Sequence, residues 1–255
     1  VTIGTVTQLV LVPMTVYAFI QLAGITGGVA IGVALVAAIP GGTTSNIFTF
    51  LARGNSPLSI SITGITTLAC LVTTPLILSL LIAEYLPPGF AMPAGLIIKD
   101  IALVLLLPLA LGMLYLRRYP TAAIAVSRWS IRGSLFVILL ILVGAASAER
   151  LDMEAFGSDN VVLVTVLLVL LMLVGRIVPL LLRLSKPDCI AIEIEASVRN
   201  TNLGVLIKVS MFPIVVGGSN SVGDMVFFTV LLYGGLQLLL AGLLIVLHRR
   251  TIRVQ

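Results

Sequence analysis

Long apolar runs dominate this sequence and limit the folds that it can adopt. Hydrophobic residues make up 59% of the 255 residues and charged residues 10%, whereas charged residues make up about 25% of a soluble domain. An apolar run of about 20 residues matches the length of a helix that crosses a bilayer. The sequence therefore predicts an all-α membrane protein with about eight transmembrane helices, at about residues 3–23, 27–52, 57–84, 95–116, 130–148, 160–183, 189–216 and 223–247.

The charges between these segments predict how the chain is oriented. One side of the membrane receives basic residues: Arg53, Arg117, Arg118, Arg128, Arg132, Arg183, Lys186, Arg249, Arg250 and Arg253. The other side receives mostly acidic residues: Glu84, Lys99, Asp100, Glu149, Arg150, Asp152, Glu154, Asp159 and Asp224. Basic loops stay in the cytoplasm, so we expect a multi-pass protein of the cytoplasmic (inner) membrane with a cytoplasmic C-terminus. The net charge of +5 reflects this asymmetry and predicts no nucleic-acid partner.

Two of the predicted segments are interrupted by polar or helix-breaking residues. The second segment contains PGGTTSN at residues 40–46, and the seventh contains polar residues from Glu195 onward. Non-helical backbone inside a bilayer is tolerated only where it is buried in protein or lines a cavity. Segments one to three and six to eight share this plan in opposite orientations. This predicts an inverted-repeat secondary transporter with two broken, crossing helices.

The residues near the breaks predict a cation site. Ser59 and Thr63 are four residues apart and therefore share one face of the third segment. Together with Ser45, Asn46 and Glu195 they offer neutral oxygens and one carboxylate. These are the ligands that a small hard cation such as Na⁺ prefers. A carboxylate deep in the membrane is costly, so its default interpretation is functional.

Three other charged groups have simpler interpretations. Arg199 follows Glu195 by four residues, and the two could do no more than neutralise each other. Glu193 is nearer the end of its segment and can be solvated there. The lone His248 stands beside two arginines at the end of the last segment and is expected to be a solvated end residue rather than a catalyst. We therefore do not predict an enzyme.

The first residues of the two half-helices after the breaks predict an anion site. Thr43 and Thr44 begin one half-helix, and Asn200 and Thr201 begin the other. The N-terminus of a helix presents free N–H groups and the positive end of the helix dipole. Two such ends that face each other favour an organic anion. The residues thus predict a transporter of Na⁺ and a small organic anion.

The two interrupted segments also resemble a known family. PGGTTSNIFTFLARGNSPLSISIT at 40–63 is similar to the characteristic motif of bile acid:sodium symporters, and EIEASVRNTNLGV at 193–205 resembles their second crossover helix. The resemblance implies a core domain at 1–84 and 160–250 and the remnant of a panel domain at 95–148. It also implies that two N-terminal helices precede the part of the family fold represented here.

The resemblance further implies two sodium sites. One would use Ser45, Asn46, Ser59, Thr63 and Glu195. The second would use Gln8, Glu195, the backbone near Ala196 and Val198, and a glutamine at the position of Arg199. A guanidinium offers no oxygen and carries its own positive charge. Arg199 could therefore replace the second sodium by pairing with Glu195 and Gln8, or could turn toward a water-filled vestibule.

These observations leave three functions open. The first is a sodium symporter for a bile-acid-like anion or a carboxylate such as pantoate or a keto acid. The second is a sodium-independent or proton-coupled anion carrier, in which Arg199 replaces a sodium ion. The third is a non-transporting membrane sensor or an inactive fragment. The sequence predicts a lipid bilayer around the chain but neither the identity of the anion nor the oligomeric state.

Overall fold

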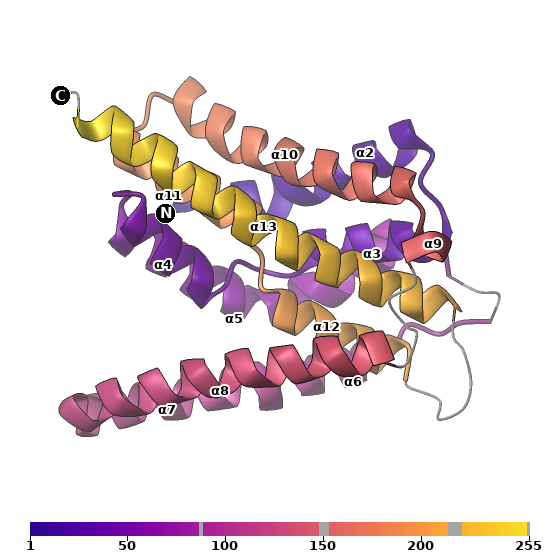
Figure 1. Ribbon diagram of the computed structural model, residues 1–255, viewed down its shortest axis with the longest axis horizontal. Helices are drawn as coiled ribbons and strands as arrows, with labels where there is room; N and C mark the ends of the chain where they lie inside the picture. Colours follow the sequence, from indigo (N-terminus) through magenta and orange to yellow (C-terminus); the bar gives the residue numbers. More distant parts are fainter. Residues whose placement is uncertain (87–88, 148–152, 214–220, 254–255) are drawn as a thin grey trace.

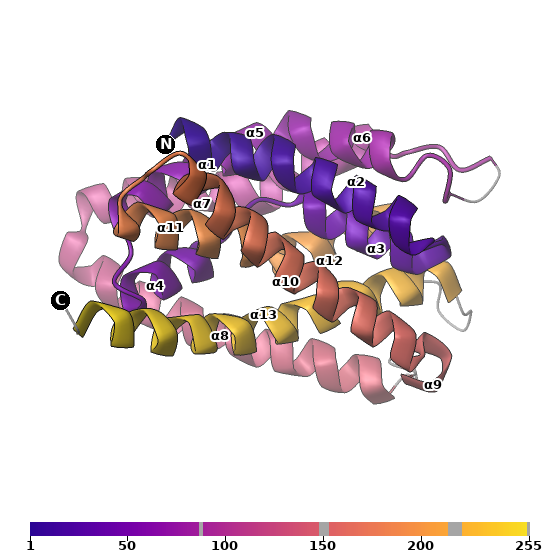
Figure 2. The same ribbon diagram turned by 90° about the horizontal axis from the view of Figure 1, so that it is seen from above.

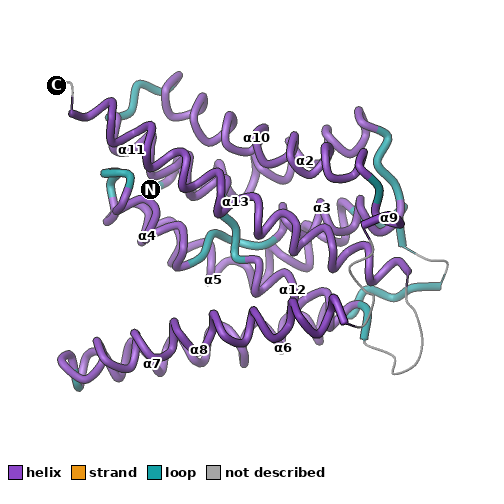
Figure 3. Tube along the Cα trace, viewed as in Figure 1, coloured by secondary structure: helices purple, strands orange, loops and turns teal. Residues whose placement is uncertain are grey.

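A computed structural model describes residues 1–86, 89–147, 153–213 and 221–253, which are built of helices (Figures 1 and 3). Within these ranges the extended pairing consists of one isolated antiparallel bridge, between Gly41 and Arg199. The all-α prediction is confirmed. Three of the charges used to predict the orientation, Glu149, Arg150 and Asp152, lie outside the described residues.

The helices follow the eight predicted segments. Six segments are single or nearly continuous helices: α1 (Thr2–Val6), a π-helical turn (Thr7–Leu11) and α2 (Val12–Ala23); α5 (Ser56–Leu81); α6 (Ala94–Asp100), a second π-helical turn (Ile101–Leu106) and α7 (Leu107–Arg118); α8 (Pro120–Ser147); α10 (Ser158–Leu181); and α13 (Ser221–Arg253). The short α9 (Met153–Phe156) precedes α10. Five of the described helical stretches are long and apolar enough to cross a membrane, and Gly27–Ala38 is a shorter apolar helix.

The other two segments are interrupted as the sequence predicts. The second consists of α3 (Gly27–Ala38) and α4 (Thr43–Leu51), and the seventh consists of α11 (Lys186–Ser197) and α12 (Thr201–Met211). Ile39 and Gly42 are extended between α3 and α4, and Val198 is extended after α11. Pro40 has no N–H for a continuing helix, which explains why α3 ends before it.

One helix begins well before the membrane segment predicted for it. Helix α8 begins at Pro120 rather than near residue 130. Arg128 and Arg132 lie inside this helix, because arginine is a good helix former and a charge does not end a helix. These two arginines indicate where a membrane segment could leave the bilayer, but they do not mark a helix end.

Helix α3 is central to the packing. Every residue from Gly28 to Ala38 is buried, and α3 packs against α13, α5 and α2. Glycines allow the closest of these approaches: a Cβ atom on Gly32 would lie 2.5 Å from the Cβ of Thr229 in α13. Small residues commonly bring membrane helices together in this way. The interrupted helix is therefore held on all sides.

Helices α6, α7 and α8 lie together along one side of the molecule (Figure 1). Helix α8 packs on α7, while α6 and the π-helical turn after it contact α5, and α6 also contacts α12. Seen from above, α10 runs beside α13, and α11 lies at the end of α10 that leads into it (Figure 2). The division into a core at 1–84 and 160–250 and a panel remnant at 95–148 stays a prediction.

Candidate functional site

The two breaks lie against each other. Gly41 and Arg199 form the antiparallel bridge, and the Asn200 N–H donates to the Pro40 carbonyl at 2.9 Å. A Cβ atom on Gly42 would lie 3.3 Å from the Cβ of Asn200. The first residues of α4 and α12 are therefore neighbours, and the backbone of one break completes the hydrogen bonding of the other.

The Glu195 carboxylate is the centre of the polar contacts at the breaks, and the side chain is fully buried. Its Oε1 atom accepts from Ser45 and Ser59 at 2.6 Å and from Thr63 at 2.9 Å. Its Oε2 atom accepts from the Gln8 amide at 2.8 Å. Three separate parts of the chain, the first π-helical turn, α4 and α5, thus donate to one carboxylate on α11.

Asn46 adds a further oxygen on the Oε1 side. Its Oδ1 atom lies 2.7 Å from the Ser59 hydroxyl and 3.2 Å from the Thr63 hydroxyl. The five residues expected to bind sodium, Ser45, Asn46, Ser59, Thr63 and Glu195, therefore lie together. Carboxylate, amide and hydroxyl oxygens from three helices converge there, which is the donor set of a hard-cation site.

The hydroxyl protons at this point are too few for the contacts. Ser45 is also 2.6 Å from the Gly42 carbonyl, so each of the three hydroxyls faces two oxygens that can only accept. The three groups together make six such contacts, but each hydroxyl has one proton to donate. With Glu195 ionised and the Asn46 amide oriented as it is here, three of these oxygen–oxygen contacts lack a proton, and a cation among the oxygens would balance them.

On the Oε2 side the donors and acceptors match. Gln8 donates to both Oε2 and the main-chain oxygen of Glu195, at 2.8 and 3.0 Å, and its own oxygen accepts from the Gly41 N–H at 3.2 Å. A Cβ atom on Gly41 would lie 2.4 Å from Oε2, so the first break needs glycine there. Gln8 thus connects the carboxylate to both breaks.

Arg199 is buried, with 2% of its surface exposed. Its Nε and Nη2 atoms donate to the carbonyls of Val36 and Ala37 at 3.2 and 2.9 Å, at the end of α3. Among the described residues its guanidinium makes no hydrogen bond to Glu195 or Gln8. That it replaces a second sodium ion stays a prediction.

The residues expected to bind the anion lie at the first turns of α4 and α12. Thr43 and Thr44 are exposed, while Asn200 and Thr201 are half-buried. Asn200 also caps α12, because its side chain accepts from the Leu203 N–H at 3.3 Å. The Ser45 N–H donates to the Gly42 carbonyl at 3.0 Å and the Thr201 N–H to the Arg199 carbonyl at 2.9 Å, so only part of the N–H groups of these first turns is available to a ligand. Gly42, which precedes Thr43, lies against Asn200, and the role of the four residues stays a prediction.

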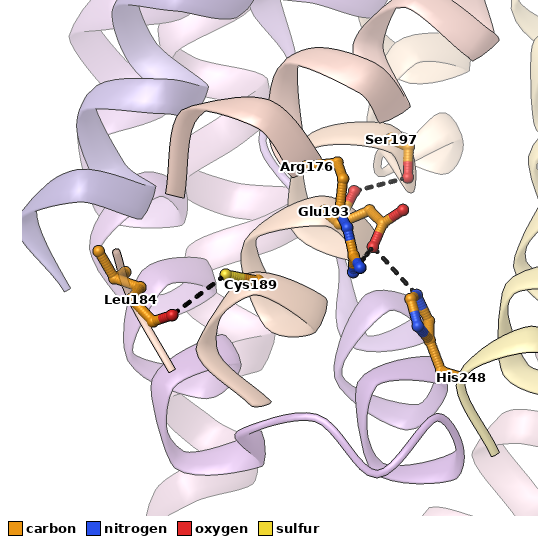
Figure 4. Close-up of polar contacts among 6 residues, drawn as sticks. All are labelled: Arg176, Leu184, Cys189, Glu193, Ser197 and His248. Carbon is orange, nitrogen blue, oxygen red and sulfur yellow. Dashed lines mark hydrogen bonds and ion pairs between the residues drawn. The ribbon is translucent and has the colours of Figure 1, made fainter. Parts of the chain in front are cut away.

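The sequence interpretation missed a second polar cluster, formed by Arg176, Glu193 and His248 (Figure 4). The Glu193 Oε2 atom lies 3.1 Å from the Arg176 guanidinium and 3.0 Å from the His248 Nε2 atom. Glu193 is 3% exposed and His248 is 7% exposed, so the expectation that both are solvated is wrong. Arg176 offered a signal, since an arginine within an apolar segment requires a partner.

A model of the Sodium Bile acid symporter family matches residues 1–149, more than half of the chain. The chain belongs to the sodium bile acid symporter family. The match includes both α3 and α4, and thus the first break with Ser45, Asn46, Ser59 and Thr63. The resemblance noted in the sequence is confirmed, and the family is one of transporters rather than enzymes.

Members of this family with curated names are similar over most of the chain. The "Uncharacterized sodium-dependent transporter YocS" of Bacillus subtilis is 31% identical over 83% of the chain and 65% of its own length. The "Probable sodium/metabolite cotransporter BASS1, chloroplastic" of Arabidopsis thaliana is 28% identical over 82% of the chain and 51% of its own length. The "Sodium-dependent organic anion transporter" of Bos taurus is 30% identical over 80% and 54%. The chain thus spans about half to two thirds of the length of these relatives.

Proposed function

We propose that this protein is a sodium-coupled symporter of a small organic anion. The observation that carries the proposal is the excess of oxygen atoms at Glu195, where three hydroxyl protons serve six short contacts. A buried carboxylate with neutral neighbours needs a compensating cation. Relatives named as sodium-dependent transporters support Na⁺ as that cation.

Sodium at Glu195 would connect the two breaks. The ligands come from α4, α5 and α11, so a bound ion holds the start of α4 against the end of α11. The first turns of α4 and α12 are then ordered side by side, with Thr43, Thr44, Asn200 and Thr201 facing the anion. Alternating access follows if the ion and the anion together favour one facing state over the other.

The orientation of the transporter is part of the same proposal. Basic residues at the ends of segments two, four, six and eight place those ends and the C-terminus in the cytoplasm. The anion is a carboxylate or a bile-acid-like molecule, because the half-helix N-termini offer N–H donors and neutral hydroxyls. The motion occurs between a core at 1–84 and 160–250 and a panel that includes 95–148.

Ligand-dependent stability of the purified chain tests this function. A ligand that binds only the native state stabilises it by mass action. We expect Na⁺, but not K⁺ at equal ionic strength, to raise the melting temperature, and pantoate, pyruvate or taurocholate to raise it further only when Na⁺ is present. Equal stability in the two salts with an anion effect in both would favour sodium-independent or proton-coupled transport. No anion effect in either salt would favour a non-transporting protein.

A further inference from the structure

We propose that the Arg199 guanidinium is a built-in cation, so that this carrier takes one sodium ion per anion and moves a monovalent anion without net charge. The inference rests on the proposed function, because it concerns the stoichiometry of the same site. It is carried by the position of Arg199, by the hydrogen bonds of the carbonyls at the end of α3 and by the charges of Glu195 and Arg199.

The guanidinium of Arg199 lies at the C-terminal end of α3. The last four carbonyls of a helix have no intrahelical partner and form the negative end of its dipole. In transporters with broken helices, such carbonyls are a place where a coupling cation binds. In this chain the guanidinium occupies that place, since it donates to Val36 and Ala37 at 3.2 and 2.9 Å.

The neighbouring carbonyls at the end of α3 also accept hydrogen bonds. The Leu35 carbonyl accepts from the Ile39 N–H at 3.1 Å, and the Ala38 carbonyl accepts from the Thr74 hydroxyl at 2.8 Å. With the two bonds from Arg199, all four terminal carbonyls of α3 have donors. A mobile cation would have to displace one of these donors.

The backbone of Arg199 is held in place by hydrogen bonds. The side chain of Gln237 in α13 accepts from its N–H at 2.8 Å and donates to its carbonyl at 3.1 Å. The bridge to Gly41 adds a further backbone link. The guanidinium is buried, and its Nη1 atom has no partner among the described residues. A charge held in this way moves with the breaks and cannot leave them.

The two carboxylate oxygens of Glu195 have different surroundings. Donor protons are fewer than acceptor contacts only on the Oε1 side. On the Oε2 side Gln8 donates to Glu195 and accepts from Gly41, so donors and acceptors are matched. One mobile cation therefore completes the site. The ionised Glu195 and Arg199 together carry no net charge, and one Na⁺ with a monovalent anion adds none.

The consequence is a carrier that does not respond to the membrane potential. If one net charge crossed per cycle, the steady-state accumulation of the anion would change roughly 50-fold per 100 mV. With one Na⁺ and one monovalent anion, the accumulation follows the sodium gradient alone. Sodium dependence should also be non-cooperative, with a Hill coefficient near unity.

The test uses proteoliposomes of the full chain with radiolabelled pantoate and taurocholate, both monovalent, an inward sodium gradient and potassium diffusion potentials set by valinomycin. We expect the same accumulation at zero and at inside-negative potential. Arg199→Lys keeps the charge but not both hydrogen bonds, so we expect a lower rate of uptake with accumulation that still does not respond to the potential. Arg199→Gln should show accumulation that rises with the potential, toward the roughly 50-fold per 100 mV of one net charge per cycle, and a Hill coefficient above unity. Arg183→Gln, in an exposed joint, is the matched control.

Direct counting of bound ²²Na⁺ on the purified chain keeps the proposal testable if the variants do not fold or neither anion is carried. One ion per chain supports the inference, and two ions overturn it. Sodium-dependent uptake that responds several-fold to the potential also overturns it while leaving the proposed function intact. A chain that binds no ²²Na⁺ and carries neither anion would contradict the proposed function itself.

Discussion

Two buried glutamates on the same helix, Glu193 and Glu195, have opposite surroundings. Glu193 faces the cationic Arg176 side chain and His248, at 3.1 and 3.0 Å. Glu195 faces three hydroxyls and an amide, and within the described ranges it forms no ion pair. The two side chains have the same chemistry and similar burial, so their neighbours must decide what each one does.

The difference separates a structural carboxylate from a binding one. A buried charge is tolerated when it is paired within the protein or when it coordinates an ion. Glu193 has its partners on α10 and α13 and therefore joins three helices permanently. Glu195 has neutral hydrogen-bond partners, and under the proposed function a bound sodium ion contacts its carboxylate. Four substitutions test this contrast.

The largest effect is expected from Glu195→Gln. The amide keeps an oxygen for the hydroxyls but removes the negative charge, so sodium binding should be lost. At a sodium concentration of 100 times the dissociation constant, the unsubstituted chain gains about 2.7 kcal/mol from binding, and the variant should gain none. Thermal unfolding in Na⁺ and in K⁺ measures this gain. Glu193→Gln is the control and should retain the sodium response, and a sodium response in Glu195→Gln would contradict the assignment.

Glu193→Ala should destabilise the fold and leave sodium binding unchanged. It removes the acceptor shared by Arg176 and His248, and a cation left without its partner in a buried position is costly. Arg176 is partly exposed, so we expect a loss of about 2 kcal/mol rather than the full cost of a buried ion pair. Chemical denaturation in K⁺ measures the stability, and ²²Na⁺ titration measures the affinity. A large change in sodium affinity would show that Glu193 and Glu195 belong to one site, which would contradict the contrast.

Ser59→Ala should weaken sodium binding about tenfold, or about 1.4 kcal/mol. Ser59 is buried and contacts both Glu195 and Asn46. Ser61→Ala on the same helix is the matched control, because the Ser61 hydroxyl is exposed and donates to its own backbone at Pro57. Sodium titrations of the two variants should separate them. Equal affinities would show that the hydroxyl at position 59 is a packing group only.

The smallest effect is expected from His248→Ala, with a loss of about 1 kcal/mol of stability. The Nε2 atom of His248 contacts Glu193, and the amide of a glutamine can reach a similar position. His248→Gln should therefore recover most of the loss. Melting temperatures of the two variants provide the measurement. Equal destabilisation by the alanine and the glutamine variants would show that the His248 ring stabilises the fold by packing and not by its contact with Glu193.

The residues whose polarity interrupts an apolar segment were predictable from the sequence. Ser45, Asn46, Ser59, Thr63 and Glu195 stand out against hydrocarbon-like neighbours, and the structure brings them together. What joins them is the four-residue periodicity of a helix and the need to bury polar groups jointly. Their proximity could thus be inferred without coordinates, whereas their affinity for sodium is still a prediction.

Contacts that depend on how whole helices pack were not predictable. Glu193 meets partners 17 and 55 residues away in the sequence, on helices whose rotation is set by close packing. A Cβ atom on Gly175 would lie 2.7 Å from the Cβ of Ala196, so this glycine lets α10 approach α11. Local spacing suggested that Arg199 pairs with Glu195, but the interruption of the helix at Val198 turns its side chain toward α3 instead.

The backbone bridge between the two breaks has a consequence for how sodium and the anion influence each other. Gly41 and Arg199 form a backbone bridge and Asn200 donates to Pro40, so the two breaks are joined through their backbones. A sodium ion that orders the first break would reduce the conformational entropy that anion binding must remove at the second break. The two ligands can then bind cooperatively without any change in the mean structure.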